Sequence, residues 1–357
     1  MQTALPARLA AHRKVATALA PLGDRRLAEL LSGARPLGSG IGGTSALLEV
    51  DGVPVFVKRV PLTDTERRPE HRHSTANLFG LPPYCQYGMG APGSPGFGAW
   101  RELAAHTATT TWVLTGGPDC FPLTHHWRIL PDAPPALPDE LADVDRAVDY
   151  WGDGVRRRIE ELARASASLV LFLEHVPRTL HDHLAEELRS GDEQRADEAV
   201  RRAERQLATG VAAMNDHGLL HFDAHFRNVL TDGRRLYFAD YGLALSSRFG
   251  LSPAEADFLA AHATHDRAYA LSYLVNWLIT TVYGHDRTER EALVHACAQG
   301  ERPPDGPAAV RAVIERHAPI AALVTDFYGR FTDGSRETPY PAEAIGRALK
   351  SPDALTP

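Results

Sequence analysis

The chain has 357 residues, of which 44% are hydrophobic, and a formal net charge of −7. This length and apolar content suffice to bury sizeable cores, and the sequence has no run of 18 apolar residues that could cross a bilayer. The acidic balance disfavours nonspecific binding to nucleic acids. Its three cysteines are widely separated, a pattern that indicates neither a disulfide framework nor a zinc site and is typical of a reducing compartment. We therefore expect a cytoplasmic protein without nucleic-acid or membrane partners.

The first 34 residues are predicted to form a helical extension. Residues 1–22 contain Arg8, Arg13 and Lys14 and no acidic residue. They lack the continuous apolar core and the cleavage pattern of a signal peptide, so a helix is the better interpretation.

A glycine-rich segment follows, in which Gly38, Gly40 and Gly43 have the spacing G-x-G-x-x-G. Glycines let backbone N–H groups approach phosphates closely, although this spacing alone is weak evidence. The next residues predict a β-hairpin, because the strand-like runs 46–50 and 53–58 flank an Asp-Gly turn. Lys58 closes the second strand.

The most informative segment is 221–230, His-Phe-Asp-Ala-His-Phe-Arg-Asn-Val-Leu. Asp223 precedes Asn228 by five residues, and Asp240 follows a short strand-like run at 236–239. A transferring phosphoryl group needs a proton acceptor, oxygen ligands for a metal ion and donors that hold the phosphates. Asp223 suits the first role, while Asn228 and Asp240 supply the oxygen ligands that Mg²⁺ prefers.

Together these segments resemble the protein-kinase-like superfamily, which includes eukaryotic-like protein kinases and the aminoglycoside and choline phosphotransferases. The resemblance matches Lys58 to the lysine of the VAIK motif and Asp223 and Asn228 to the catalytic loop. Asp240-Tyr241-Gly242 matches the DFG motif with Tyr in place of Phe, and His221 matches the leading histidine of the catalytic loop, whose role is structural.

The resemblance implies an α+β fold with two lobes, a small N-lobe with an antiparallel sheet and a mainly helical C-lobe. The N-lobe would span 35–173 with insertions near 61–98 and 131–160, and the C-lobe would span 174–357. It further implies an ATP-dependent kinase with Mg²⁺ as cofactor. Catalytic roles fall on Asp223, Lys58 and His225, and metal ligation falls on Asn228 and Asp240. The residues implied for ATP binding are Gly38, Gly40, Gly43, Lys58, Glu102, Glu174 and Val176.

The glutamate that pairs with Lys58 is predicted to be Glu102. Glu66 and Glu70 lie nearer in sequence, but their charged, Pro-containing stretch favours a solvated loop. Glu102 instead lies at the start of a helical pattern in which Trp100, Leu103 and Ala104 share one face. The Gly-, Pro- and Tyr-rich stretch 82–98 is consistent with either a substrate lid or a flexible decoration.

Two helices are expected in the C-lobe, at 196–217 and 266–283. The second is apolar on most of its surface, which predicts a central core helix. Asp266 opens it. By resemblance it would brace the catalytic-loop backbone, and a simple favourable charge at the helix N-terminus is the alternative.

The resemblance implies a hydroxyl group as the phosphate acceptor, and we expect a small molecule in preference to a protein or peptide. His225 stands where serine/threonine kinases usually have Lys, and residues 243–265 contain no Ala-Pro-Glu motif, which favours a small-molecule acceptor. The three glycines and the run Asp-Tyr-Gly-Leu-Ala favour a protein or peptide acceptor instead.

Parts of the sequence are compatible with two other classes of protein. The pattern His221-x-Asp223-x-His225 could present three ligands of a metal-dependent hydrolase on one side of a strand. That hypothesis leaves Asn228, Asp240 and Lys58 without a role. A noncatalytic pseudokinase scaffold would usually lack Lys58, Asp223 or Asp240, and all three are present.

Overall fold

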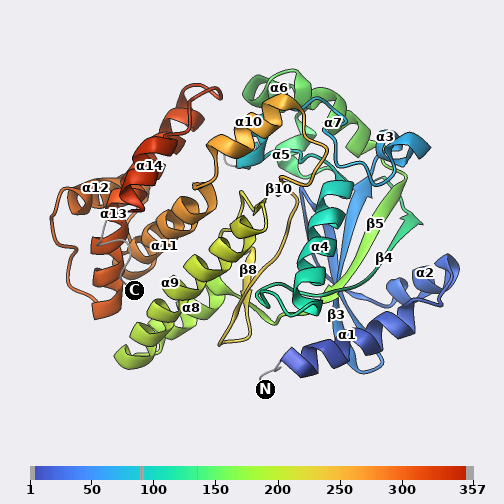
Figure 1. Ribbon diagram of the computed structural model, residues 1–357, viewed down its shortest axis with the longest axis horizontal. Helices are drawn as coiled ribbons and strands as arrows, with labels where there is room; N and C mark the ends of the chain where they lie inside the picture. The colour runs from blue at the N-terminus through green and yellow to red at the C-terminus, as the bar shows by residue number, and fades with distance from the viewer. Residues whose placement is uncertain (1–4, 89, 91, 135, 351–357) are drawn as a thin grey trace. The chain divides into compact units, whose positions relative to one another are not determined.

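The computed structural model describes residues 5–88, 90, 92–134 and 136–350, and it is a mixed α+β protein (Figure 1). The chain divides into two compact units. The first consists of the described residues up to Val176 together with Asp240–Ala256, and the second of Pro177–Ala239 and the residues from Asp257 onward. The predicted α+β class is confirmed, whereas the two-lobed kinase arrangement stays a prediction. The ends of the predicted segments that fall on 1–4 and 351–357, and positions 89, 91 and 135 of the insertions, lie outside the described residues.

The first unit combines a sheet with helices on both of its faces. Its strands are β1 (Arg35–Gly40), β2 (Gly43–Val50), β3 (Val53–Leu62), β4 (Thr124–Pro131), β5 (Ala167–Glu174) and β10 (Leu245–Ser246). Its helices are α1 (Leu5–Leu19), α2 (Asp24–Ser32), α3 (Asp64–Arg67), the 3-10 helices η1 (Pro69–His71) and η2 (Pro83–Tyr87), α4 (Ala99–Leu114), α5 (Asp139–Ala142), α6 (Val144–Trp151), α7 (Gly154–Ala163) and the start of α10 (Pro253–Ala261).

The sheet is antiparallel with the strand order β1-β2-β3-β5-β4. The predicted hairpin is present as β2 and β3, joined by Asp51 and Gly52 with φ of 50° and 77°. Two successive residues with positive φ are typical of the type I′ turns that match the twist of a hairpin. This turn fixes the register in which Lys58 lies opposite Ser45 on β2 and Leu171 on β5.

Successive side chains of β3 point to opposite faces, and each face has its own core. Val55 and Val57 pack with α1 and α2, whereas Val60 and Leu62 pack with α4. Figure 1 shows α4 lying across the sheet. Lys58 lies in phase with Val60, so its side chain starts from the face that α4 covers.

The two insertions pack against each other. The indole N–H of Trp151 on α6 donates to the carbonyl oxygens of Pro92 and Gly93, and the amide of Gly93 donates to Glu140. Several side chains of the stretch 82–98 are fully or almost fully buried, namely Cys85, Gln86, Tyr87, Ser94 and Phe97. The described part of this stretch is therefore a packed segment and not an exposed decoration.

The expectation that Glu66 lies in a solvated loop is wrong. Glu66 is buried in α3, where it forms a capping box with Thr63. Its carboxylate also accepts from the Arg158 guanidinium and from the backbone amide of Ala99, the first residue of α4. The cation on α7 compensates the buried charge, and the carboxylate supplies an acceptor at the N-terminus of α4.

The unit boundaries differ from those expected. β5 continues pairing with β3 as far as Glu174, and the first unit ends at Val176 instead of residue 173. In the helical extension expected over residues 1–34, Val15, Leu19, Leu27 and Leu31 pack into a core of the sheet. Asp240–Ala256 joins the first unit because, as described below, its side chains pair with β3 and α4.

The second unit is mainly helical. Its elements are β6 (Arg178–Thr179), α8 (Leu180–Arg189), α9 (Glu193–Asp216), β7 (Leu219–Leu220), β8 (Val229–Thr231), β9 (Leu236–Phe238), α11 (His265–Tyr283), α12 (Arg287–Ala298), α13 (Ala308–Asp333) and α14 (Ala342–Ala348). The helices predicted at 196–217 and 266–283 correspond to α9 and α11. α11 packs against both α9 and α13, which confirms its central position. Among the described helices, none has the combined length and apolar character that a membrane crossing requires.

Candidate functional site

Lys58 lies between two carboxylates of the first unit. Its Nζ atom is 2.7 Å from Glu102 Oε1 and 2.8 Å from Asp240 Oδ1. Glu102 comes from the first turn of α4, which lies against the face of β3 from which Lys58 projects. The pair expected from the sequence, Lys58 with Glu102, is present, and Asp240 completes a cluster of three residues far apart in the chain.

Burial and charge together set the protonation of this cluster. Burial disfavours the Lys58 ammonium, but the charges of Asp240 and Glu102 outweigh it and raise the pKa of Lys58. Burial raises the pKa of Glu102, and Asp240 adds to that rise while Lys58 opposes it. Lys58 is therefore a cation at neutral pH. The Asp240 side chain keeps 43% of its exposure, compared with 2% for Glu102, so Asp240 is the carboxylate that a ligand can reach.

The glycine-rich hairpin of β1 and β2 approaches Lys58 at Gly42, which is not one of the three glycines of the G-x-G-x-x-G motif. A Cβ atom on Gly42 would lie 3.1 Å from Lys58 Nζ. Gly43 has φ of 111°, and a Cβ there would lie 1.9 Å from the carbonyl oxygen of Arg59, so the backbone requires glycine. A Cβ atom added to Gly38 or to Gly40 would meet no other heavy atom within 4 Å. Of the three predicted glycines, only Gly43 is therefore demanded by packing and conformation.

A pocket of about 530 Å³ beside β1 does not belong to this cluster. It is lined by Gly38 and Ser39, by α2 residues, and by Ala46 and Val57 of the opposite sheet face. The Lys58 side chain is not among its lining residues.

The residues after β9 hold Asp240 in an uncommon backbone conformation. Asp240 has φ of 64°, in the left-handed region, and the amide of Gly242 lies 3.4 Å from its Oδ1 atom. Tyr241 is fully buried and contacts the ring of His106 edge-on, with centroids 4.7 Å apart. His106 follows Glu102 by one helical turn of α4, and its Nε2 atom is 3.9 Å from Glu102 Oε1. A strained residue beside a charged cluster is a common feature of functional sites.

A second ion pair connects α4 with the segment that follows Asp240. Arg101 Nη2 lies 2.6 Å from Glu255 Oε1, and both side chains are 2% exposed. Arg101 also donates to the carbonyl oxygen of Thr75 and packs between the rings of Phe97 and Phe249. Thus Arg101 pairs with Glu255 near one end of the segment Asp240–Ala256, while its neighbour Glu102 shares Lys58 with Asp240 at the other end.

In the second unit, Asp223 and Asn228 are neighbours. The Asn228 side-chain nitrogen donates to the Asp223 backbone oxygen and to Asp223 Oδ2, both at 3.0 Å. The backbone amide of Ala239 donates to the carbonyl oxygen of Asn228, so β8 and β9 hold the loop that leads to Asp240. The sequence expectation that these two residues act together is consistent with this geometry.

Asp266 braces the backbone at the start of the segment that contains Asp223 and Asn228. Its carboxylate accepts from the backbone amides of His221 and Phe222 at 2.5 and 2.9 Å, and it is fully buried at the start of α11. Phe222 has φ of 61°, so these bonds hold a strained backbone. Burial raises the pKa of Asp266, but the contacts with His265 and His221 outweigh it and lower the pKa overall. These two hydrogen bonds agree with the bracing role expected for Asp266, in addition to any favourable charge at the helix N-terminus.

The two histidines of the pattern His-x-Asp-x-His have different surroundings. His221 is fully buried, with Nε2 at 3.0 Å from the carbonyl oxygen of Ala239, as a structural residue would be. His225 is partly exposed, with Nε2 at 3.8 Å from Asp223 Oδ2 and its ring beside Tyr273. The described residues contain no group of three His, Cys, Asp or Glu side chains placed to hold a metal ion.

Glu174 ends β5 and Val176 follows two residues later, where nucleotide contacts are expected by resemblance. The Glu174 carboxylate is already paired, because Arg8 on α1 donates to both of its oxygens at 2.8 Å. Arg8 is buried and also donates to backbone oxygens of Asp119 and Phe121. The Glu174 side chain is therefore a structural anchor, and a nucleotide contact there would use the backbone.

Sequence reasoning missed several of these residues. The spacing of Glu102 and His106 is that of neighbours on one helix face and could have singled out His106. Gly42 adjoins the glycine motif but falls outside its spacing. Nothing local predicts the partners of Arg101 or Arg8, which lie 154 and 166 residues away in the sequence.

No protein-family model matches the chain, and a search of the curated proteins finds no match. Lys58, Glu102 and Asp240 come together in the first unit, and Asp223, Asn228 and His225 come together in the second.

Proposed function

We propose that the protein is an ATP-dependent phosphotransferase that moves the γ-phosphoryl group of ATP to the hydroxyl of a small molecule. The observation that carries this proposal is the cluster of Lys58, Glu102 and Asp240. A buried lysine held as a cation by two carboxylates, with Gly42 directly above it, suits the binding of a polyphosphate.

The reaction is an in-line displacement. The acceptor oxygen forms a bond to the γ-phosphorus as the bond from that phosphorus to the β-bridging oxygen breaks, and ADP leaves. Asp223 accepts the hydroxyl proton, and its position is fixed by Asn228. Lys58 holds the phosphates, while His225 lies near enough to Asp223 to contact the acceptor or the transferring group.

Asn228 and Asp240 would each hold a magnesium ion through an oxygen atom. The Asn228 side-chain nitrogen is engaged with Asp223, which leaves the amide oxygen as the ligating atom, and the Asp240 carboxylate is accessible beside Lys58. Oxygen atoms of this kind are the ligands that Mg²⁺ prefers. When bound, the metal neutralises negative charge on the phosphates.

The acceptor is proposed to be small because little chain is available to dock a peptide. Between Gly242 and Asp266 the segment contains α10, and its start is held by Arg101 through Glu255. A protein or peptide hydroxyl is the second candidate, favoured by the glycine hairpin over Lys58 and by the run Asp-Tyr-Gly-Leu-Ala.

The test is phosphate transfer from labelled ATP into a panel of metabolites and proteins, with and without Mg²⁺, for the wild type, Asp223→Ala and Asp240→Ala. Asp216→Ala, an exposed carboxylate at the end of α9, is the matched control. We expect Mg²⁺-dependent transfer that both active-site variants abolish and the control retains. Background turnover with every acceptor would identify a scaffold, and a hydrolytic activity that survives Asp240→Ala would identify a metal-dependent hydrolase.

A further inference from the structure

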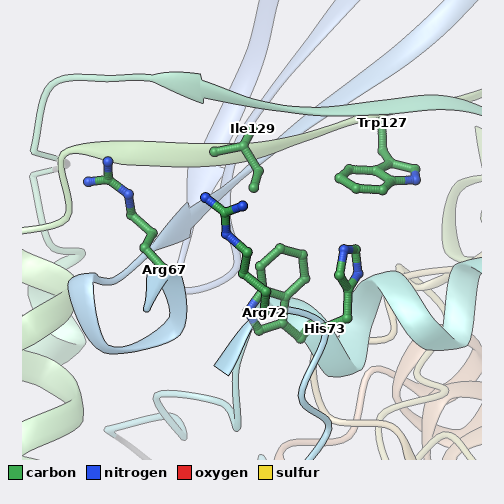
Figure 2. Close-up of a pocket in the computed structure, with 6 residues that line it drawn as sticks. Arg67, Arg72, His73, Trp127 and Ile129 are labelled. Atoms are coloured by element: carbon green, nitrogen blue, oxygen red, sulfur yellow. The ribbon is translucent and has the colours of Figure 1, made fainter. Parts of the chain in front are cut away.

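A second pocket of the first unit lies away from the Lys58 cluster, between α3, α4 and β4. It has a volume of about 280 Å³ and is lined by Arg67, Arg72, His73, Trp100, Trp127 and Ile129 (Figure 2). β4 is an edge strand of the sheet, and Trp127 and Ile129 project from it on the face that α4 covers. α4 covers this face only in part, because both side chains remain partly exposed.

The pocket has two chemically different ends. Figure 2 shows the guanidinium groups of Arg67 and Arg72 at one end and the rings of His73 and Trp127 at the other. The His73 ring lies 4.7 Å from the ring of Trp100 and 5.5 Å, edge-on, from that of Trp127. In this view Arg72 and Ile129 lie next to each other, between Arg67 on one side and the two rings on the other.

The backbone of His73 is in the left-handed region, with φ of 57°. Such a conformation is uncommon outside glycine, so it persists only where surrounding contacts fix it. Here it brings the imidazole against two indoles at the mouth of a pocket. The aromatic end is thus shaped by a strained residue.

The cationic end carries more positive charge than its neighbours neutralise. Arg67 pairs with the exposed Asp64 and donates to Ser166, and such an exposed pair is weak. Within the described part of the chain, Arg72 takes part in no hydrogen bond or ion pair. Planar guanidinium groups bind carboxylates and phosphates through paired hydrogen bonds.

We propose that this pocket binds a small organic anion made of one aromatic or similarly flat ring and a carboxylate or phosphate group. The acid group would contact Arg72 and Arg67, while the ring would pack on Trp127 and His73. The volume lies just below the range of about 300–1,000 Å³ typical of pockets for drug-sized ligands, so a single ring with one acid group is the fitting size. None of the residues that line this pocket belongs to the proposed phosphotransfer machinery.

The test is isothermal titration of the full chain, without nucleotide, using benzoate and phenyl phosphate as probes. Benzamide lacks the charge, and acetate and inorganic phosphate lack the ring. We expect saturable binding of the two aromatic anions and at least about tenfold weaker binding of the other three compounds. Equal binding of inorganic phosphate and phenyl phosphate would overturn the proposal, as would the absence of saturable binding by either aromatic anion.

Matched variants assign the binding to this pocket. Arg72→Gln should weaken binding about tenfold, whereas Arg68→Gln, an exposed neighbour outside the pocket, should leave it unchanged. Trp127→Leu should likewise weaken binding, with Trp112→Leu on α4 as its control. Equal effects of the paired variants would contradict the assignment. If a phosphotyrosine peptide bound at least tenfold more tightly than phenyl phosphate, the ligand of this pocket would be a protein and the proposal of a small molecule would be wrong.

Discussion

Arg101 and Glu255 form an ion pair 2.6 Å long in which both side chains are almost completely removed from water. Burial lowers the pKa of Arg101, and Glu255 counteracts this shift by stabilising the guanidinium cation. Glu255 also accepts from the backbone amide and the hydroxyl of Ser252, so one carboxylate both caps α10 and binds α4.

Glu255→Gln should therefore destabilise the protein strongly. The substitution leaves the Arg101 charge buried without a counterion, and breaking a buried pair in this way typically costs about 3–5 kcal/mol. Chemical denaturation measures the loss. Arg156→Gln, which breaks the exposed pair with Asp145, is the control and should have little effect. A change as small as that of the control would show that Arg101 does not depend on Glu255.

Gly43→Ala should destabilise the glycine hairpin, since the added Cβ meets the Arg59 carbonyl oxygen and the backbone has positive φ. Strain of this kind costs on the order of 1–3 kcal/mol before any steric overlap is counted. Gly40→Ala, where a Cβ has open space, should be tolerated. Thermal unfolding of the two variants compares them directly, and equal melting temperatures would contradict the strain assigned to Gly43.

Lys58→Met and Glu102→Gln should both reduce phosphotransfer, on the function proposed above. Without Lys58 the phosphates lose a cation, and without the Glu102 charge Lys58 loses one of its two anchors. Removal of one preorganised charge contact commonly costs about 10²–10³ in turnover. Steady-state kinetics with varied ATP, together with separate measurement of ATP affinity, distinguish binding from catalysis. Turnover within a factor of about two of the wild type for Lys58→Met would exclude this role.

Acid should destabilise the first unit through His125. Its ring nitrogen lies 3.1 Å from that of His12 on α1, and burial together with His12 lowers the pKa of His125 to about 3. In the unfolded chain the pKa is near 6.5, so the unfolded state binds the proton first as the pH falls. The stability is complete above about pH 6.5 and declines towards about pH 3, by up to about 2 kcal/mol at pH 5.

Denaturation at pH 7.5 and pH 5 measures this dependence, and His125→Gln should reduce it. His295 should have the opposite effect on stability, because Glu291 and Asp326 raise its pKa. Its contribution to stability is present in acid and disappears as the pH rises through the pKa of the folded state. His295→Gln should therefore leave the loss in acid intact. A loss in acid that is unchanged in His125→Gln would assign it to other groups.

The parts of the fold that the sequence predicted correctly are those with local causes. The Asp-Gly turn determined the hairpin of β2 and β3, and the helical periodicity located α4 and α11 to within a few residues. The choice of Glu102 followed from its place at the start of a helix. Each of these predictions used residues that lie close together along the chain.

The failures have nonlocal causes. Glu66 was expected to be solvated because its neighbours are charged, yet a cation 92 residues away in sequence, Arg158, permits its burial. The sequence likewise did not reveal how the first helices pack on the sheet, since the partner of Arg8, Glu174, lies 166 residues away in the sequence. Periodicity and spacing carry no information about such distant partners.

The anchoring of α1 has a practical consequence for anyone who shortens the protein. A chain that began after residue 22 would lose Val15 and Leu19 from the core that they form with Val55, Val57 and Phe172, and it would leave Glu174 without its guanidinium. Bare apolar sheet surface promotes self-association. Such a truncated preparation should aggregate, and poor recovery from it would reflect the missing helix and not an intrinsically unstable protein.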